Sequence, residues 1–157
     1  MAGYWLFKTE PESFSINDLE KCPDKKEGWD GIRNYQARNY MRDDASVGDP
    51  VFIYHSSCKT IGIAGLAEIT QTGLVDPTQF DPESKYFDPK STPESPRWIM
   101  VELRHVETFD SVLSTQAIKS IDGIKQLPLL KRGHRLSIMP VDKNEFDILL
   151  EHARARQ

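Results

Sequence analysis

The sequence predicts an α+β fold, a small curled β-barrel of five to six strands with flanking helices. Strand-like and helix-like segments follow one another irregularly, without the regular strand-helix repeat of a doubly wound parallel sheet. Gly62 and Gly65 fall inside an apolar strand-like run, where glycines are typical of bulges that allow a sheet to curl. The length of 157 residues suits a single domain, residues 1–157.

The first half of the chain alternates between aromatic or β-branched runs and capped polar segments. The run at 4–7 is a first strand that stops at Lys8, because Pro11 ends any regular ladder. Ser15, with an acidic residue three places on, is expected to cap a short helix, and Asn34 a second helix from 35 to about 42. A polar connection at 21–28 separates these segments, and strands are expected at 51–55 and 61–70.

Five prolines interrupt residues 71–96, so this stretch is predicted to be a long loop. Its aromatic residues, among them Tyr86 and Phe87, indicate a loop that packs over a site. Beyond it the sequence predicts a strand at 98–108, a helix at 114–121 and a strand at 136–139. Asp142 and Glu145 form a capping pair for a final helix.

Composition and charge exclude several classes of protein. No apolar run reaches the roughly 18 to 20 residues of a membrane helix, and two isolated cysteines suit a reducing compartment, so we expect a soluble, cytoplasmic protein without membrane contact. The net charge of −4 argues against coating nucleic acid by bulk attraction. Two local segments at 31–42 and 123–141 nevertheless hold basic residues without acids, and these are either solvated faces or contact surfaces.

No residue pattern predicts catalysis. His55 and Cys58 would point to opposite faces of a strand, although a turn at Ser56 could bring them together. The other histidines show no metal-ligand spacing, and no phosphate-binding glycine loop occurs, so neither a metal nor a cofactor is expected. We predict a non-catalytic protein, with a hydrolase or nuclease acting on nucleic acid as the enzyme alternative.

Recognition of an extruded base needs aromatic faces, polar edge-binding groups and cations for phosphates, and all three occur here. Trp29 stands in a glycine-flanked loop, where it either anchors a contact or folds back onto the core. In the first case its removal should weaken binding and leave the fold intact. Glu10 and Asp30 could accept hydrogen bonds from a base, and Lys8 could meet a phosphate. The candidate phosphate and backbone contacts are Arg33, Asn34, Arg38, Arg132 and Arg135, with helix capping as the alternative for Asn34.

The chain resembles the EVE family, a branch of the PUA-like fold related to the YTH readers of methylated adenine. The resemblance covers nearly the whole chain and rests on the segments 4–14, 29–39, 47–49, 54–56, 62–68, 88–90, 96–98 and 136–141.

The resemblance implies a PUA-like barrel with a pocket for a modified base in DNA or RNA, either methylated or hydroxymethylated cytosine or methylated adenine. Trp29 would form one wall of this pocket, while the opposing wall is open between Tyr86, Phe87 and Trp98. A small-molecule-binding or protein-binding module is the other alternative. The residues that would line the pocket are Lys8, Thr9, Glu10, Ser13, Trp29, Asp30, Tyr86 and Trp98.

Overall fold

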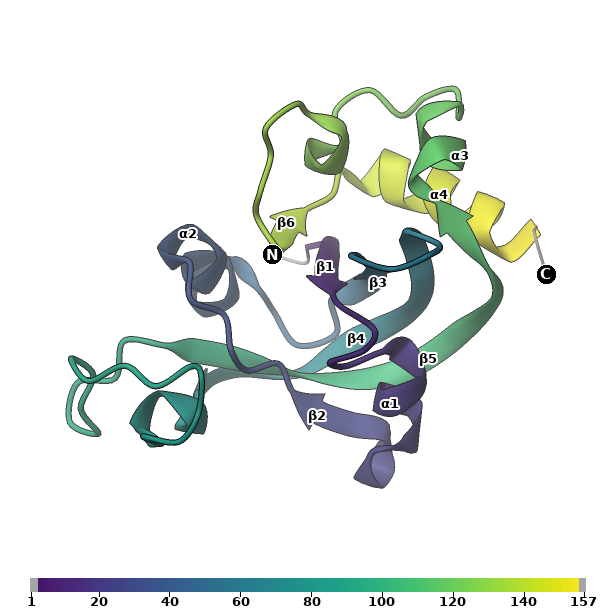
Figure 1. Cartoon of the computed structure of the whole chain (residues 1–157). Helices are drawn as coiled ribbons and strands as arrows, with labels where there is room; N and C mark the ends of the chain where they lie inside the picture. Colours follow the sequence, from purple (N-terminus) through teal and green to yellow (C-terminus); the bar gives the residue numbers. More distant parts are fainter. Residues whose placement is uncertain (1–2, 156–157) are drawn as a thin grey trace.

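The computed structural model describes residues 3–155, which form one six-stranded mixed sheet and four α-helices. The strands lie in the order β2-β5-β4-β3-β1-β6. Two long antiparallel strands, β4 (Gly62–Val75) and β5 (Ile99–Ser114), bend through the molecule and curl the sheet (Figure 1). The predicted α+β class is confirmed. In the described chain the sheet stays open at its edge strands, β2 (Lys26–Gly28) and β6 (Ile138–Pro140), and does not close into a barrel.

Strand β1 (Trp5–Thr9) lies near one edge of the sheet and contributes side chains to both of its faces. It pairs in parallel with β3 (Pro50–His55) and antiparallel with β6. Neighbouring side chains of a strand point in opposite directions. Trp5 and Phe7 therefore enter one apolar cluster, called the first cluster, and Leu6 enters another, called the second cluster. Both faces of β1 are therefore buried, which fixes the position at which its last residues emerge.

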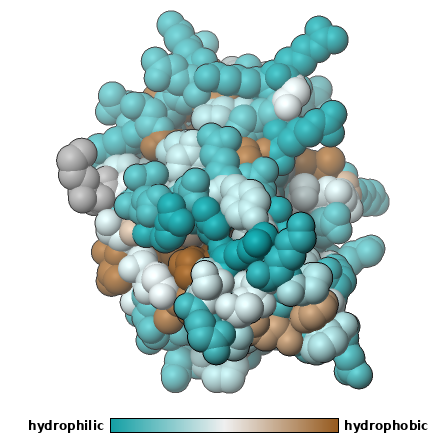
Figure 2. Space-filling model, turned by 90° about the vertical axis from the view of Figure 1, so that its left-hand side faces the viewer, coloured by the Kyte–Doolittle hydropathy of each residue, from teal (hydrophilic) through white to brown (hydrophobic). Residues whose placement is uncertain are grey.

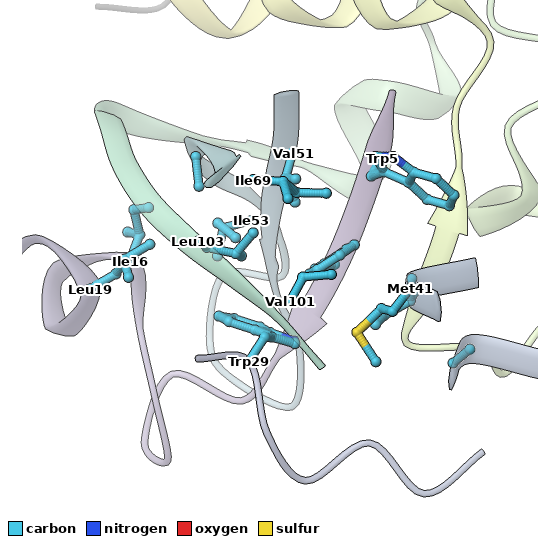
Figure 3. Packing of buried hydrophobic residues seen from close by; sticks show 14 of the residues in the cluster. Trp5, Ile16, Leu19, Trp29, Met41, Val51, Ile53, Ile69, Val101 and Leu103 are labelled. Atoms are coloured by element: carbon cyan, nitrogen blue, oxygen red, sulfur yellow. The ribbon is translucent and has the colours of Figure 1, made fainter. Parts of the chain in front are cut away.

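Helices cover the two ends of the curled sheet. Helix α1 (Ile16–Lys21) packs on β5 together with the first cluster, which Figure 3 shows from close by. Helices α3 (Thr115–Lys119) and α4 (Lys143–Ala155) cover the second cluster at the opposite end (Figure 1). The remaining helical segments are α2 (Tyr35–Asn39), a π-helical turn (Tyr40–Asp44) and the 3-10 turns Pro23–Lys25, Pro77–Phe80 and Pro128–Leu130.

The helix starts agree with the capping residues in the sequence. The Ser15 side chain accepts a hydrogen bond from the Asp18 N–H, and the Asp18 carboxylate accepts one from the Ser15 N–H, which completes the capping box of α1. The Asn34 Oδ1 accepts the Ala37 N–H at 3.0 Å and caps α2. At α4, Asp142 accepts N–H groups of the first turn as predicted. The expected partner Glu145 instead binds the preceding loop through the N–H groups of Lys125 and Gln126.

Two features of the sheet bear on the site. A register shift between Ile63 and Gly65 confirms the predicted irregularity, and a Cβ at Gly65 would lie 2.4 Å from the Ile16 side chain, so α1 can approach β4 only at a glycine. Strand β2 falls in the segment that was expected to be a polar connection. Among the described residues, no helix has the length and apolar character needed to cross a bilayer.

Candidate functional site

A cavity of about 840 Å³ opens where β1 ends. Its lining comes from the end of β1 and the turn after it, the end of β2 and the loop after it, the loop before β5, and single residues next to β3 and β6. Seven of the predicted pocket residues line it: Lys8, Thr9, Glu10, Ser13, Trp29, Asp30 and Tyr86. The residues that the sequence reasoning missed are Phe14, Glu27, Gly28, Gly31, Ile32, Ser56, Lys85 and Ser137.

Backbone hydrogen bonds fix the wall that follows β1. The N–H groups of Ser13 and Phe14 both donate to the Glu10 carbonyl at 2.9 Å, and the Thr9 hydroxyl donates to the Phe14 carbonyl at 2.7 Å. These three hydrogen bonds fix the shape of the turn. Next to it the ammonium group of Lys8 lies 5.8 Å from the Tyr54 ring centroid, and burial lowers the pKa of this lysine.

Trp29 belongs to the core and to the cavity at the same time. Only 7% of the residue is exposed, and its ring packs against Phe7 and Phe14 with centroid distances of 5.8 Å. The backbone N–H of Trp29 donates to the Val101 carbonyl at 2.8 Å. Figure 3 shows the indole within the first apolar cluster. The expectation that removal of Trp29 leaves the fold intact is therefore wrong, because the ring fills core volume.

Tyr86 lines the cavity from the long loop, and Gly31 makes its position possible. Gly31 has a φ of +79°, and a Cβ there would lie 2.7 Å from the Tyr86 ring. The ring thus packs directly on the backbone of the loop that follows Trp29. Of the three aromatic residues considered for the opposing wall, Tyr86 lines the cavity, whereas Phe87 and Trp98 do not.

Arg33 holds this loop in place, which is a different role from the predicted phosphate contact. It donates to the Tyr86 carbonyl from Nε (2.9 Å) and Nη2 (2.7 Å), and to the Thr78 hydroxyl from Nη2 (3.0 Å). Its Nη1 donates to the Ile32 carbonyl (2.9 Å) and to Asp76 (3.0 Å). A guanidinium group has five N–H donors, so these five bonds leave none for a phosphate.

Asp76 is the carboxylate at the centre of this arrangement. It is 1% exposed and also accepts the N–H groups of Gly31 and Thr78, each at 2.8 Å. Burial acts to raise the pKa of Asp76, but the hydrogen bonds from Thr78, Gly31 and Arg33 together outweigh it and lower the pKa. The group therefore stays ionised at neutral pH and pairs with the Arg33 guanidinium.

Asp30 stands exposed at the cavity wall, and its environment disfavours its charge. Loss of hydration raises the pKa of Asp30, the negative charges of Asp76 and Glu27 raise it further, and Arg33 opposes the shift. Glu10 and Glu27 line the same cavity, so three carboxylates face a shared space. Lys8 and Lys85 line the same cavity, so the site combines acceptors for hydrogen-bond donors with positive charge for anionic groups.

The remaining predicted contacts lie outside the cavity lining. Trp98 is 5% exposed and donates from Nε1 to Asp88 at 2.8 Å, which lowers the pKa of that carboxyl. Arg38 donates to the Asn39 side chain and to the Arg97 carbonyl, so it too ties segments of the fold together. Asn34 serves as the cap of α2, the alternative that the sequence left open.

The basic segment before β6 reaches the cavity lining at Ser137. Arg132 and Arg135 are exposed there, and the Lys8 N–H donates to the Ser137 carbonyl at 2.7 Å. The pKa of His134 is lowered by burial and by the positive charges of Lys8 and a neighbouring lysine. Lys8 is the lining lysine next to this segment, and Lys85 lines the cavity from the long loop.

The residues considered for a catalytic pair are engaged elsewhere. His55 Nε2 accepts the Ile16 N–H at 3.1 Å, and burial lowers the pKa of this histidine, so the neutral ring connects β3 to α1. Cys58 Sγ donates to the Thr60 carbonyl at 3.3 Å. Within residues 3–155, no three histidine, cysteine or acidic side chains form a group that could hold a metal ion.

Fold and cavity together define a class of protein, a small α+β domain whose open curled sheet carries a cavity with aromatic and charged residues where its first strand ends. The EVE domain family model matches residues 3–152, and the chain belongs to this family. Human thymocyte nuclear protein 1 is 39% identical over 167 aligned residues, which cover 96% of this chain and 73% of the relative. The name of this relative includes the word nuclear, and the cytoplasmic location of the present chain stays a prediction.

Solved structures agree with this assignment. A protein of Leishmania major superposes with a TM-score of 0.93 at 43% identity and covers 100% of this chain and 98% of its own. Human THYN1, solved in complex with DNA that contains 5-methylcytosine, superposes with a TM-score of 0.90 at 37% identity. That match covers 97% of this chain and 98% of the human chain.

Proposed function

We propose that this protein binds DNA that carries a modified base, and that the cavity at the end of β1 accepts this base after its extrusion from the strand. The observation that carries the proposal is the cavity itself, in which Trp29 and Tyr86 supply aromatic surface and carboxylates supply acceptors. The related human protein solved with 5-methylcytosine DNA supports the proposal. Base extrusion provides the means by which a small domain reads a single base.

The size of the cavity is consistent with this ligand. Small-molecule sites commonly span about 300 to 1,000 Å³, and the present cavity has a volume of about 840 Å³. Tyr86 contributes a partly exposed ring from the long loop, whereas Trp29 is buried and only 7% exposed. We infer that Tyr86 makes the larger stacking contact, which contributes about 1 to 3 kcal/mol per base.

The carboxylates favour bases with an exocyclic amine. Cytosine offers its N4 amine and adenine its N6 amine as donors, whereas thymine and uracil offer a single ring N3–H between two carbonyl oxygens that carboxylates repel. Glu10, Glu27 and Asp30 are the acceptors available in the cavity. Methylated or hydroxymethylated cytosine and methylated adenine therefore remain the proposed ligands, with cytosine favoured by the human complex.

The strand on either side of the base needs positive charge for its phosphates. Arg33 has no donor left for this role, so we assign it to Lys8 and to the exposed side chains of Arg132 and Arg135, in the segment before the lining residue Ser137. Each phosphate contact that a cation makes adds to the salt dependence of binding. Arg132→Gln should therefore reduce the salt dependence of DNA binding without changing the preference between bases.

The experiment compares Tyr86→Ala with Phe87→Ala, its neighbour in the same loop. Tyr86→Ala keeps the backbone carbonyl that Arg33 binds, so the loop stays anchored while the ring is lost. Phe87 is 39% exposed and does not line the cavity, which makes it a matched control. Affinities are measured by calorimetry with oligonucleotides that differ only in one central base: cytosine, 5-methylcytosine, 5-hydroxymethylcytosine, adenine or N6-methyladenine.

We expect the parent protein to prefer one modified oligonucleotide. Tyr86→Ala should lower that affinity about 5- to 150-fold, and Phe87→Ala should leave it unchanged. Equal affinity of the parent for modified and unmodified oligonucleotides would overturn the proposal. Repeating the series with RNA of the same sequence tests the choice of DNA, since a stronger response to RNA would reassign the substrate.

A further inference from the structure

Tyr35 presents an aromatic ring to solvent outside the cavity. It is 50% exposed and stacks on Trp98 with a centroid distance of 4.8 Å and an interplanar angle of 22°. Trp98 is itself fixed, because its Nε1 donates to Asp88 and its N–H donates to the buried Gln79 side chain. An exposed ring that is already held in one orientation loses little conformational freedom when a ligand stacks on it.

Arginine side chains surround this ring. The Arg38 guanidinium carbon lies 4.7 Å from the Tyr35 centroid, and Arg97 Nη1 donates to the Tyr35 hydroxyl at 3.5 Å. The nearby carboxylate of Asp88 accepts a hydrogen bond from Trp98, which lowers the pKa of Asp88. The positive charges of Arg97 and Arg33 lower this pKa further. An aromatic face beside guanidinium groups is the composition that binds single-stranded nucleic acid, with stacking for a base and cations for its phosphates.

We propose that the exposed face of Tyr35 is a second stacking site, which binds an unpaired nucleobase of the same strand whose modified base enters the cavity. The proposal rests on the function proposed above and extends it from one base to a stretch of strand. The view in Figure 2 is taken from the side on which α2 and the loop between β4 and β5 lie in Figure 1. Side chains on that face are mostly hydrophilic, as a surface for a charged strand requires.

A continuous row of side chains connects the two sites and limits their separation. The Arg33 guanidinium carbon lies 5.5 Å from the Tyr86 centroid and 5.1 Å from that of Trp98, which stacks at 4.8 Å on Tyr35. The Tyr35 and Tyr86 centroids are therefore at most about 15 Å apart. At the roughly 3.4 Å rise per nucleotide of a stacked strand, this distance is about five nucleotides or fewer. One short strand can reach both rings.

The test uses single-stranded oligonucleotides with at least six nucleotides on each side of one central cytosine or 5-methylcytosine, and compares Tyr35→Ala, Tyr35→Phe and Tyr86→Ala. Tyr35→Ala should weaken binding of both oligonucleotides by the same factor, about fivefold or more, and leave the preference between them unchanged. Tyr35→Phe keeps the ring and should retain parental affinity. Tyr86→Ala should instead remove the preference. Thermal unfolding of each variant shows whether the fold is retained.

The outcomes separate this proposal from the previous one. Unchanged affinity of a folded Tyr35→Ala for both oligonucleotides would overturn the second site. A Tyr35→Ala protein that loses the preference for 5-methylcytosine would place Tyr35 in the pocket and overturn it equally. If the parent shows no preference for the modified base, the pocket proposal fails. A ring-dependent loss at Tyr35 would then still support strand binding at this surface.

Discussion

The guanidinium group of Arg33 donates two hydrogen bonds to the Tyr86 carbonyl oxygen, at 2.9 Å from Nε and 2.7 Å from Nη2. These residues lie 53 positions apart in the sequence; Tyr86 lines the cavity, and Arg33 comes directly after the lining residue Ile32. Because Asp76 binds both Arg33 and the Gly31 N–H, the same group of contacts also fixes the loop that carries Trp29 and Asp30. The partly buried Arg33–Asp76 ion pair therefore connects two segments that line the cavity.

Replacing Arg33 by lysine should loosen the cavity without changing its charge. A lysine ammonium is a compact group and cannot reproduce the planar fork that reaches the Tyr86 carbonyl and Asp76 together. We expect a loss of about 1 to 3 kcal/mol in the free energy of unfolding, measured with urea, and weaker binding of the modified oligonucleotide. Arg132→Lys serves as the control, because it makes the same change at an exposed arginine. Stability equal to the parent's would contradict the role assigned to the ion pair.

Gly31→Ala tests the contact between the Tyr86 ring and the loop beneath it. The change adds a Cβ 2.7 Å from the ring at a residue whose φ is +79°. Gly73→Ala is the matched control, since Gly73 has a φ of +69° but no atom within 4 Å of its Cβ position. Both variants should lose about 1 kcal/mol of stability from backbone strain. Only Gly31→Ala should also lose binding in calorimetry, and equal binding by the two variants would count against the contact.

Local signals in the sequence identified much of the fold. Ser15 and Asn34 cap helices as predicted, because a cap depends on neighbours two or three residues away. Strand β2 was missed because its residues, Lys26 to Gly28, are polar and become a strand only by pairing with the edge of β5. Such pairing depends on tertiary contacts, which a local pattern does not contain.

The site shows the same division between local and distant information. Seven pocket residues were named from segments 8–13, 29–30 and 86. The role of Arg33 was not, because its acceptors at 76, 78 and 86 are brought near it only by the folded loop. The resemblance leaves Trp98 as one of three alternatives for the opposing wall, whereas it stacks on Tyr35 outside the cavity lining. Whether the seven residues bind a base stays a prediction.

Trp29→Phe is the variant that tests this residue, since truncation to alanine would remove about 3 to 5 kcal/mol of core packing. Phenylalanine keeps an aromatic ring against Phe7 and Phe14 but is smaller than the indole. We expect a moderate loss of about 1 to 2 kcal/mol in denaturant unfolding, with binding reduced less than by Tyr86→Ala. A larger binding loss at Trp29 than at Tyr86 would reverse the assignment of the main stacking surface.

Because of Asp30, the stability of the protein and its affinity for the base should change in opposite directions with pH. Loss of hydration, with Asp76 and Glu27, raises the pKa of Asp30 in the folded protein above its ordinary value. The folded state therefore binds the proton more tightly than the unfolded chain does. The stabilisation from protonated Asp30 is complete below the unfolded pKa and is lost as the pH rises through the folded pKa. Relative to Asp30→Asn, the parent should become less stable as the pH increases.

Binding should follow the reverse course, because an ionised Asp30 is the better acceptor for the amine of a bound cytosine. The affinity advantage of the parent over Asp30→Asn should therefore grow as the pH rises through the same range, and it should vanish at low pH. Denaturant unfolding and calorimetry on both proteins at matched pH values measure the two differences. Parallel changes in stability and affinity would show that Asp30 acts through the fold alone, since only a direct contact with the base makes the two trends diverge.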